Sequence, residues 1–241
     1  MVKSNKLKII LGLFYLIVVS SFLYFFLSKF TFEELSSYEF IKNNSEYFFE
    51  LKKTNLALVS IIFFTSTVVW VLLAGFGLPV ALLGGFIFGK WFGLLIIIVG
   101  MSVGATILYM LANYFFKEII KEKFLTKFKS LEKKFKKSEF IYLLVYRFVG
   151  GIPFALSNIL PCIFNVKIRN FFLATLIGIT PQLFLVVSIG SGLEKIIKQN
   201  LKAPSLTDLM LAPEIYIPVI AFFVLIIVTL ILKKIFYKKA N

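Results

Sequence analysis

The chain has 241 residues, of which 59% are hydrophobic and 16% are charged, and its mean hydropathy is +0.93. Soluble domains have roughly 45–50% apolar and about 25% charged residues. The composition therefore argues against a cytosolic enzyme, a secreted disulfide scaffold and a disordered tail, and predicts a polytopic, all-α membrane protein. The net charge of +15 comes almost entirely from lysine, which flanks membrane spans, so we expect no nucleic-acid partner.

The residue inventory limits the chemistry of the chain. There is no histidine, and Cys162 is the only cysteine. Disulfides, Cys/His zinc sites and Ser-His-Asp catalysis are thereby excluded within one chain. We expect no metal, no cofactor and no enzymatic activity.

The first 53 residues are predicted to hold an N-terminal anchor helix and a polar loop. An uncharged run, 9–28, follows three lysines and lacks a small-residue cleavage pattern, so it indicates an uncleaved anchor. The stretch 29–53 carries five glutamates and is expected to be a loop with a short surface helix.

The next uncharged run, 54–89, is too long for one upright helix and too short for two spans, which need about 20 residues each. Gly75, Gly77 and Pro79 interrupt it, and only about ten apolar residues follow before Lys90. A short segment bounded by Gly and Pro is typical of a re-entrant helix, predicted here over about 78–90. A full span is predicted over 91–116, with small residues for close helix packing.

The segment 117–139 contains nine lysines and four glutamates, yet large apolar residues recur at spacings of four and three. This pattern predicts a basic amphipathic helix on the membrane surface, with lysines toward anionic headgroups. The alternative is a solvated linker, which would leave five large apolar side chains in water.

The apolar stretch 140–164 is interrupted by Arg147, Gly151 and Pro153, among others, and predicts a second re-entrant segment over about 144–162. Clean spans are predicted over 170–193 and 215–232. The core is then 54–195, followed by a loop, a last span and a basic tail over 196–241. Two short segments in corresponding places indicate an inverted repeat, in which opposed hairpin tips meet near the midplane.

Arg147 is the sharpest candidate for a site, because a charge within an apolar segment costs roughly 2.5–3.5 kcal/mol on insertion scales. One interpretation is structural: Arg147 reaches a membrane surface, or pairs with carbonyls freed by Gly151 and Pro153. The other is that its guanidinium binds an anionic group, with a lipid phosphate as the leading candidate. No Asp or Glu lies between Glu139 and Glu194 or between Glu50 and Glu118, so no intramembrane proton relay can be drawn.

Neutral polar residues also occur within the predicted spans, and most are expected to hydrogen-bond between helices. They are Asn113, Asn158, Thr180, Gln182 and Ser188. Asn158 is the exception, because it lies on the segment of Arg147 and Pro153 and could line the same polar cavity. Gly84, Gly85 and Gly89 are expected to permit tight turns or close packing, because no phosphate-binding loop motif surrounds them.

Two blocks of the sequence resemble the DedA/VTT-domain family, also called SNARE-associated Golgi protein homologues. The first is Leu83-Gly84-Gly85-Phe86-Ile87-Phe88-Gly89, followed by Gly93 and 100–105. The second runs from Tyr146-Arg147-Phe148 through Ile152-Pro153-Phe154 to Asn158, then Phe171, Gly178, Pro181 and Gly190. The blocks and the basic segment between them cover about residues 75–195.

The resemblance implies two opposed re-entrant helices and the movement of phospholipids or undecaprenyl phosphate between leaflets. By this resemblance Arg147, Pro153, Phe154 and Asn158 bind substrate, and a second set shapes the hairpins: Gly84, Gly85, Phe88, Gly89, Gly151 and Pro181. The acidic hairpin residues of the classical bacterial branch are absent, and Asn113 stands where an arginine is common. The chain is more similar to the branch shared with yeast and animal Golgi and ER proteins, which argues against proton-driven transport.

The leading hypothesis is a lipid translocase, or scramblase, in a bacterial plasma membrane, with membrane lipids of anionic headgroup as its partners. Arg147 would pair with the headgroup phosphate while the acyl tails remain in lipid. The alternatives are a transporter or channel for a small anion and a non-catalytic membrane scaffold. Self-association into a homo-oligomer is left open.

Overall fold

The computed structural model describes residues 2–29, 42–149 and 152–198, together with isolated positions between 211 and 224. Every element in these ranges is helical. Most of the predicted last span over 215–232, most of the segment 196–241 and Gly151 lie outside the described residues.

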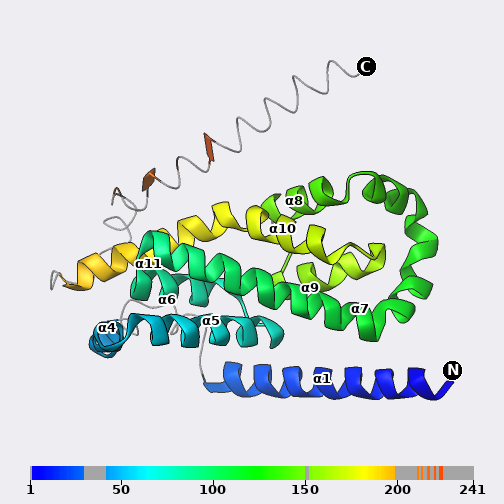
Figure 1. The fold of residues 1–241 in the computed structure, drawn as a ribbon, viewed down its shortest axis with the longest axis horizontal. Coiled ribbons are helices and arrows are strands. Elements are labelled where there is room, and N and C mark those ends of the chain that lie inside the picture. The colour runs from blue at the N-terminus through cyan, green and yellow to red at the C-terminus, as the bar shows by residue number, and fades with distance from the viewer. Residues whose placement is uncertain are drawn as a thin grey trace.

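The N-terminal helix α1 (Val2–Lys29) includes the predicted anchor, and the short α4 (Ser45–Thr54) lies within the predicted polar loop. In Figure 1, α1 runs along one edge of the molecule. It contacts α7, and the Tyr15 hydroxyl donates a hydrogen bond to the Leu72 carbonyl oxygen. Many of its large apolar side chains, such as Phe14 and Phe25, are exposed.

The uncharged run 54–89 is split, as the glycines and proline predicted. Helix α5 (Leu56–Leu72) begins at Asn55, whose side chain accepts a hydrogen bond from the Leu58 N–H at 3.0 Å. It ends in a turn in which Ala74 has a φ of 60° and the Gly75 N–H donates to the Trp70 carbonyl oxygen at 2.8 Å. This 6→1 hydrogen bond closes the end of the helix. The short α6 (Gly77–Phe88) follows and stops at Gly89, which has a φ of 78°.

Helix α7 (Lys90–Lys137) contains both the predicted span and most of the predicted amphipathic segment. The helix does not end near residue 116, because the sequence there has no glycine or proline to stop it. Figure 1 shows α7 curving at its far end toward α8. The side chains of 116–135 lie outside those described, so the surface position of this segment stays a prediction.

The stretch 140–164 is broken, in agreement with its glycines and prolines. Helix α8 (Glu139–Val149) ends before the loop, and α9 (Phe154–Ile159) leads directly into the 3-10 turn η1 (Leu160–Phe164). Asn165 then takes the left-handed conformation with a φ of 49°. Glu139 accepts hydrogen bonds from the Lys167 backbone N–H and the Asn170 side chain, so it ties the start of α8 to the start of the next helix.

The predicted span over 170–193 is not one continuous helix. The structure has two helices there, α10 (Ile168–Gly178) and α11 (Thr180–Lys198), and they bend by 43° at Ile179. Pro181 accounts for the break, because it lacks a backbone N–H and its ring clashes with the carbonyl group one turn earlier.

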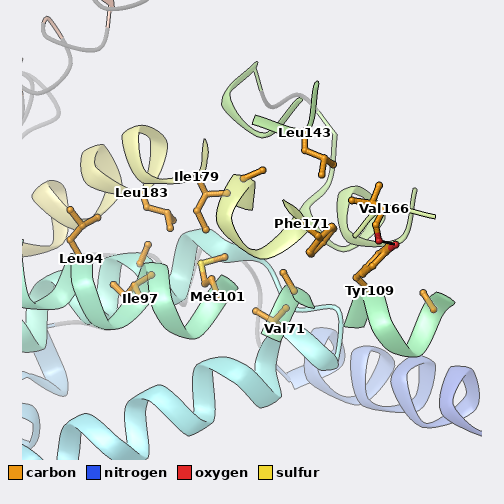
Figure 2. Packing of buried hydrophobic residues seen from close by; sticks show 14 of the residues in the cluster. Val71, Leu94, Ile97, Met101, Tyr109, Leu143, Val166, Phe171, Ile179 and Leu183 are labelled. Carbon is orange, nitrogen blue, oxygen red and sulfur yellow. Dashed lines mark hydrogen bonds between the residues drawn. The ribbon is translucent and has the colours of Figure 1, made fainter. Parts of the chain in front are cut away.

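The buried core joins helices α5 to α7 with helices α8 to α11. Helix α6 packs on α11 and α7, α5 packs on α7, α8 packs on α10, and α9 and η1 pack on α7. Figure 2 shows the larger apolar cluster, to which Val71, Ile97, Leu143, Phe171 and Leu183 belong. By length and hydropathy, 90–115 can cross a membrane as one helix, and α10 with α11 can do so as a bent pair.

Candidate functional site

Arg147 lies in the last turn of α8, with only 4% of its surface exposed. Its guanidinium makes three side-chain hydrogen bonds. Nε donates to Thr175 Oγ1 on α10 at 3.1 Å, Nη1 to Ser157 Oγ at 2.5 Å and Nη2 to Asn158 Oδ1 at 2.7 Å. Arg147 therefore links α8 to both α9 and α10, and we call these four residues the arginine cluster.

Aromatic rings surround the charge of the arginine cluster. The Arg147 guanidinium carbon lies 5.9 Å from the ring centroid of Tyr146, 5.5 Å from that of Phe154 and 5.0 Å from that of Phe171. Phe171 in turn stacks on Tyr109 of α7 at 4.4 Å, and the Tyr109 hydroxyl donates to the Val166 carbonyl oxygen at 2.7 Å (Figure 2). The rings add cation–π attraction in a site from which water is largely excluded.

The unfilled hydrogen-bonding groups of the cluster are donors. A guanidinium has five N–H donors, and described residues accept from three of those on Arg147, so one N–H group each on Nη1 and Nη2 has no acceptor among them. The Asn158 side-chain nitrogen is buried and has no hydrogen-bond partner among the described residues. Nor does any described carboxylate pair with Arg147, whose partners are neutral oxygens and rings. A buried cation with spare donors is suited to an anionic group that carries several acceptor oxygens.

The predicted substrate-binding residues occupy different places. Phe154 and Asn158 contact the Arg147 guanidinium. Pro153 is exposed at the start of α9, where its carbonyl oxygen accepts a hydrogen bond from the Ser157 backbone N–H at 2.9 Å. It therefore helps to begin the helix that carries two members of the cluster and does not itself bind Arg147.

Arg147 is not at a membrane surface as the first structural alternative proposed, because its side chain is buried in the protein. Its acceptors among the described residues are side-chain oxygens of three other residues. Pairing with carbonyls freed by Gly151 and Pro153 stays a prediction, because residues 150–151 lie outside those described. Backbone carbonyls are bound by Gln182, whose Nε2 donates to the oxygens of Arg147 and Phe148 at 3.2 and 2.8 Å.

The sequence did not single out Ser157 or Thr175. Ser157 is adjacent to Asn158 and could have been found from that neighbour. Thr175 reaches Arg147 only because α8 and α10 pack together, and no sequence spacing between them signals this contact. Gln182 was noted only as one of the neutral polar residues expected to bond between helices, and it does so.

The predicted hairpin residues lie mostly at close helix contacts. A Cβ atom on Gly85 would stand 2.1 Å from the Val187 carbonyl oxygen, and one on Gly84 would stand 2.4 Å from the Ile97 side chain. Phe88 is buried and packs edge-on against Phe63. Gly89 has nothing within 4 Å of an added Cβ, so its positive φ is what favours glycine there. Pro181 lies at the bend between α10 and α11.

Exposed apolar helices around a buried polar cluster define a helical membrane protein. Residues 76–192 match the family model of the VTT domain, and this part of the chain belongs to that family. The matched region contains α6, the arginine cluster and Gln182. The family expected from the two sequence blocks is thereby confirmed.

Three relatives match parts of the chain. It is 30% identical over 115 residues to uncharacterized protein YqeD of Bacillus subtilis, covering 47% of this chain and 55% of that protein. It is 26% identical over 136 residues to the transmembrane protein 41 homolog of Caenorhabditis elegans, and the match covers 54% of this chain and 55% of that protein. It is 28% identical over 153 residues to the transmembrane protein 41 homolog of Dictyostelium discoideum, and the match covers 60% of this chain and 44% of that protein. The chain thus spans about half the length of these relatives, and no solved structure matches it.

Proposed function

We propose that this chain moves a phosphate-bearing lipid between the leaflets of a bacterial plasma membrane. The observation that carries the proposal is that Arg147 has N–H groups with no acceptor among the described residues. Among the described residues, two guanidinium N–H groups and the Asn158 amide nitrogen have no acceptor, and no carboxylate balances the buried positive charge of Arg147. A phosphate group supplies the missing negative charge and acceptor oxygens together.

A comparison of how α7 packs on α5 and how α10 packs on α8 supports a binding role for Arg147. A Cβ on Gly104 of α7 would stand 2.8 Å from Val71 Cβ and 3.1 Å from the Val68 carbonyl oxygen. A Cβ on Gly178 of α10 would stand 2.5 Å from Arg147 Cβ and 3.1 Å from the Leu144 carbonyl oxygen. The same glycine contact thus recurs at the ends of α5 and α8, as an inverted repeat would require.

Val71 and Arg147 are equivalent in this comparison, and both are buried. A valine fills the position in the first half, so the packing does not require an arginine in the second. A buried charge that packing does not require is expected to serve binding.

Access to the site requires a movement of α9. Arg147 is 4% exposed, and its Nη1 and Nη2 atoms hold Ser157 and Asn158 of that helix. Phosphate oxygens can replace the two side-chain acceptors, so headgroup binding would release α9 from α8, while the bond to Thr175 keeps the guanidinium oriented. The headgroup would then pass between the hairpins with its acyl chains in lipid, and no covalent bond changes.

The proposal is tested with the purified chain in liposomes, without ATP or a pH gradient. Leaflet exchange is measured for fluorescent phosphatidylglycerol and for fluorescent glucosylceramide, which lacks phosphate. We expect exchange of the first lipid to exceed that of protein-free liposomes and exchange of the second to remain at background. Absence of phosphatidylglycerol exchange with correctly folded protein would contradict the proposal. Release of entrapped inorganic phosphate without lipid exchange would indicate an anion pathway in its place.

A further inference from the structure

Gln182 contacts the peptide group of Arg147 from a different helix. Helix α8 ends at Val149, so the carbonyl oxygens of its last turn have no partners within the helix. The side-chain Nε2 of Gln182 donates to two of them, at 3.2 Å to the Arg147 oxygen and at 2.8 Å to the Phe148 oxygen. A single amide group therefore caps the part of α8 that carries the guanidinium.

The bend between α10 and α11 sets the position of this amide. The two helices meet at 43°, and Gln182 lies in the first turn after the bend, next to Pro181. On the other side of the bend, Gly178 lets α10 pack closely against α8. A Cβ atom added to Gly178 would stand 2.5 Å from Arg147 Cβ. The end of α8 is thus held at its carbonyl groups by α11 and at its side chain by α10.

We infer that Gln182 is a positioning residue that orients Arg147 for phosphate binding, an inference that rests on the proposed function. Gln182 makes no hydrogen bond to the guanidinium itself, so it acts through the backbone. Without its N–H groups, two carbonyl oxygens lose their donor at a part-buried site, and the last turn of α8 reorients to recover partners. The guanidinium is then no longer held in the orientation in which its two N–H groups without acceptors can bind a phosphate.

Substitution Gln182→Met keeps the size of the side chain and removes the donors. The chain has only two arginines, so the side-chain Nε–Hε signals of Arg147 and Arg169 can be followed separately by ¹⁵N NMR of the full chain in nanodiscs. We expect the Arg147 signal to shift or broaden, the Arg169 signal to stay in place, and phosphatidylglycerol exchange to fall about tenfold. Gln182→Leu, which also lacks the N–H groups and carries no charge, should give the same pattern and replaces Gln182→Met if that variant does not fold.

Ser188→Ala is the matched control, because Ser188 is a buried α11 residue whose hydroxyl donates to the Phe184 carbonyl oxygen within the same helix at 2.7 Å. It should leave the Arg147 signal and the exchange rate unchanged. A merely structural role for Gln182 would lower stability but leave the Arg147 signal of the folded protein in place, and that result would overturn the inference. The NMR result does not depend on lipid exchange, so failure of the proposed function is seen separately, as absence of exchange by the wild type.

Discussion

Replacement of Arg147 by methionine is expected to lower phosphatidylglycerol exchange about 10- to 100-fold, which corresponds to the loss of one or two hydrogen bonds to a charged group. The guanidinium holds the only charge in the arginine cluster, and the groups that remain cannot supply a positive charge to a phosphate. Arg147→Lys should restore part of the rate, because it keeps the charge but has no planar fork for bidentate binding. The measurement is the initial rate of leaflet exchange in liposomes.

The same substitution should also lower stability by about 1–3 kcal/mol, because it leaves the buried Asn158 side-chain oxygen without its donor. Exchange rates are therefore compared only for protein that has been shown to be folded. Arg169→Met, at the exposed second arginine, is the matched control and should keep the wild-type rate. A folded Arg147→Met protein with wild-type exchange would contradict the assigned role.

Replacement of Gly85 by alanine should destabilise the chain by about 3 kcal/mol, because it overpacks a contact between two helix backbones. The added Cβ would stand 2.1 Å from the Val187 carbonyl oxygen, and backbone cannot turn away as a side chain can. The contact is reciprocal, since a Cβ on Gly190 of α11 would stand 2.1 Å from the Leu82 carbonyl oxygen of α6. Thermal melting of the detergent-solubilised protein measures the effect.

Gly100→Ala is the control for the intrinsic helix preference of alanine, which exceeds that of glycine by about 1 kcal/mol. The three atoms nearest to its Cβ would be side-chain atoms of Thr67 and Phe64, at 3.2–3.4 Å. We expect its melting temperature to equal or exceed that of the wild type. A Gly85→Ala protein as stable as Gly100→Ala would show that α6 and α11 do not approach as closely as described.

The sequence predicted helices and breaks best where local chemistry decides them. Gly75, Gly77 and Pro79 marked the break between α5 and α6, because glycine and proline act on the backbone where they stand. The bend at Ile179 was missed although Pro181 was noted, because high hydropathy on both sides suggested one continuous span.

The candidate site was predicted only in part, because some of its residues stand out in their local sequence and others depend on how the helices pack. Arg147 and Asn158 stood out as polar residues in an apolar segment, and they do bind each other. Thr175 and Gln182 come from α10 and α11, and their roles depend on how those helices pack against α8. Small polar residues are common in membrane helices, so nothing in their local sequence distinguishes these two from residues such as Ser188, which bonds within its own helix.

Arg147 is proposed to bind the phosphate of a lipid. The most direct test of this binding is a titration of the ¹⁵N-arginine-labelled chain in nanodiscs with short-chain phosphatidylglycerol, with short-chain diacylglycerol as the phosphate-free comparison. We expect a saturable shift of the Arg147 Nε–Hε signal with the phosphate lipid alone, while the Arg169 signal stays in place. An Arg147 signal that does not move, in protein that exchanges phosphatidylglycerol in liposomes, would show that Arg147 does not bind the lipid phosphate.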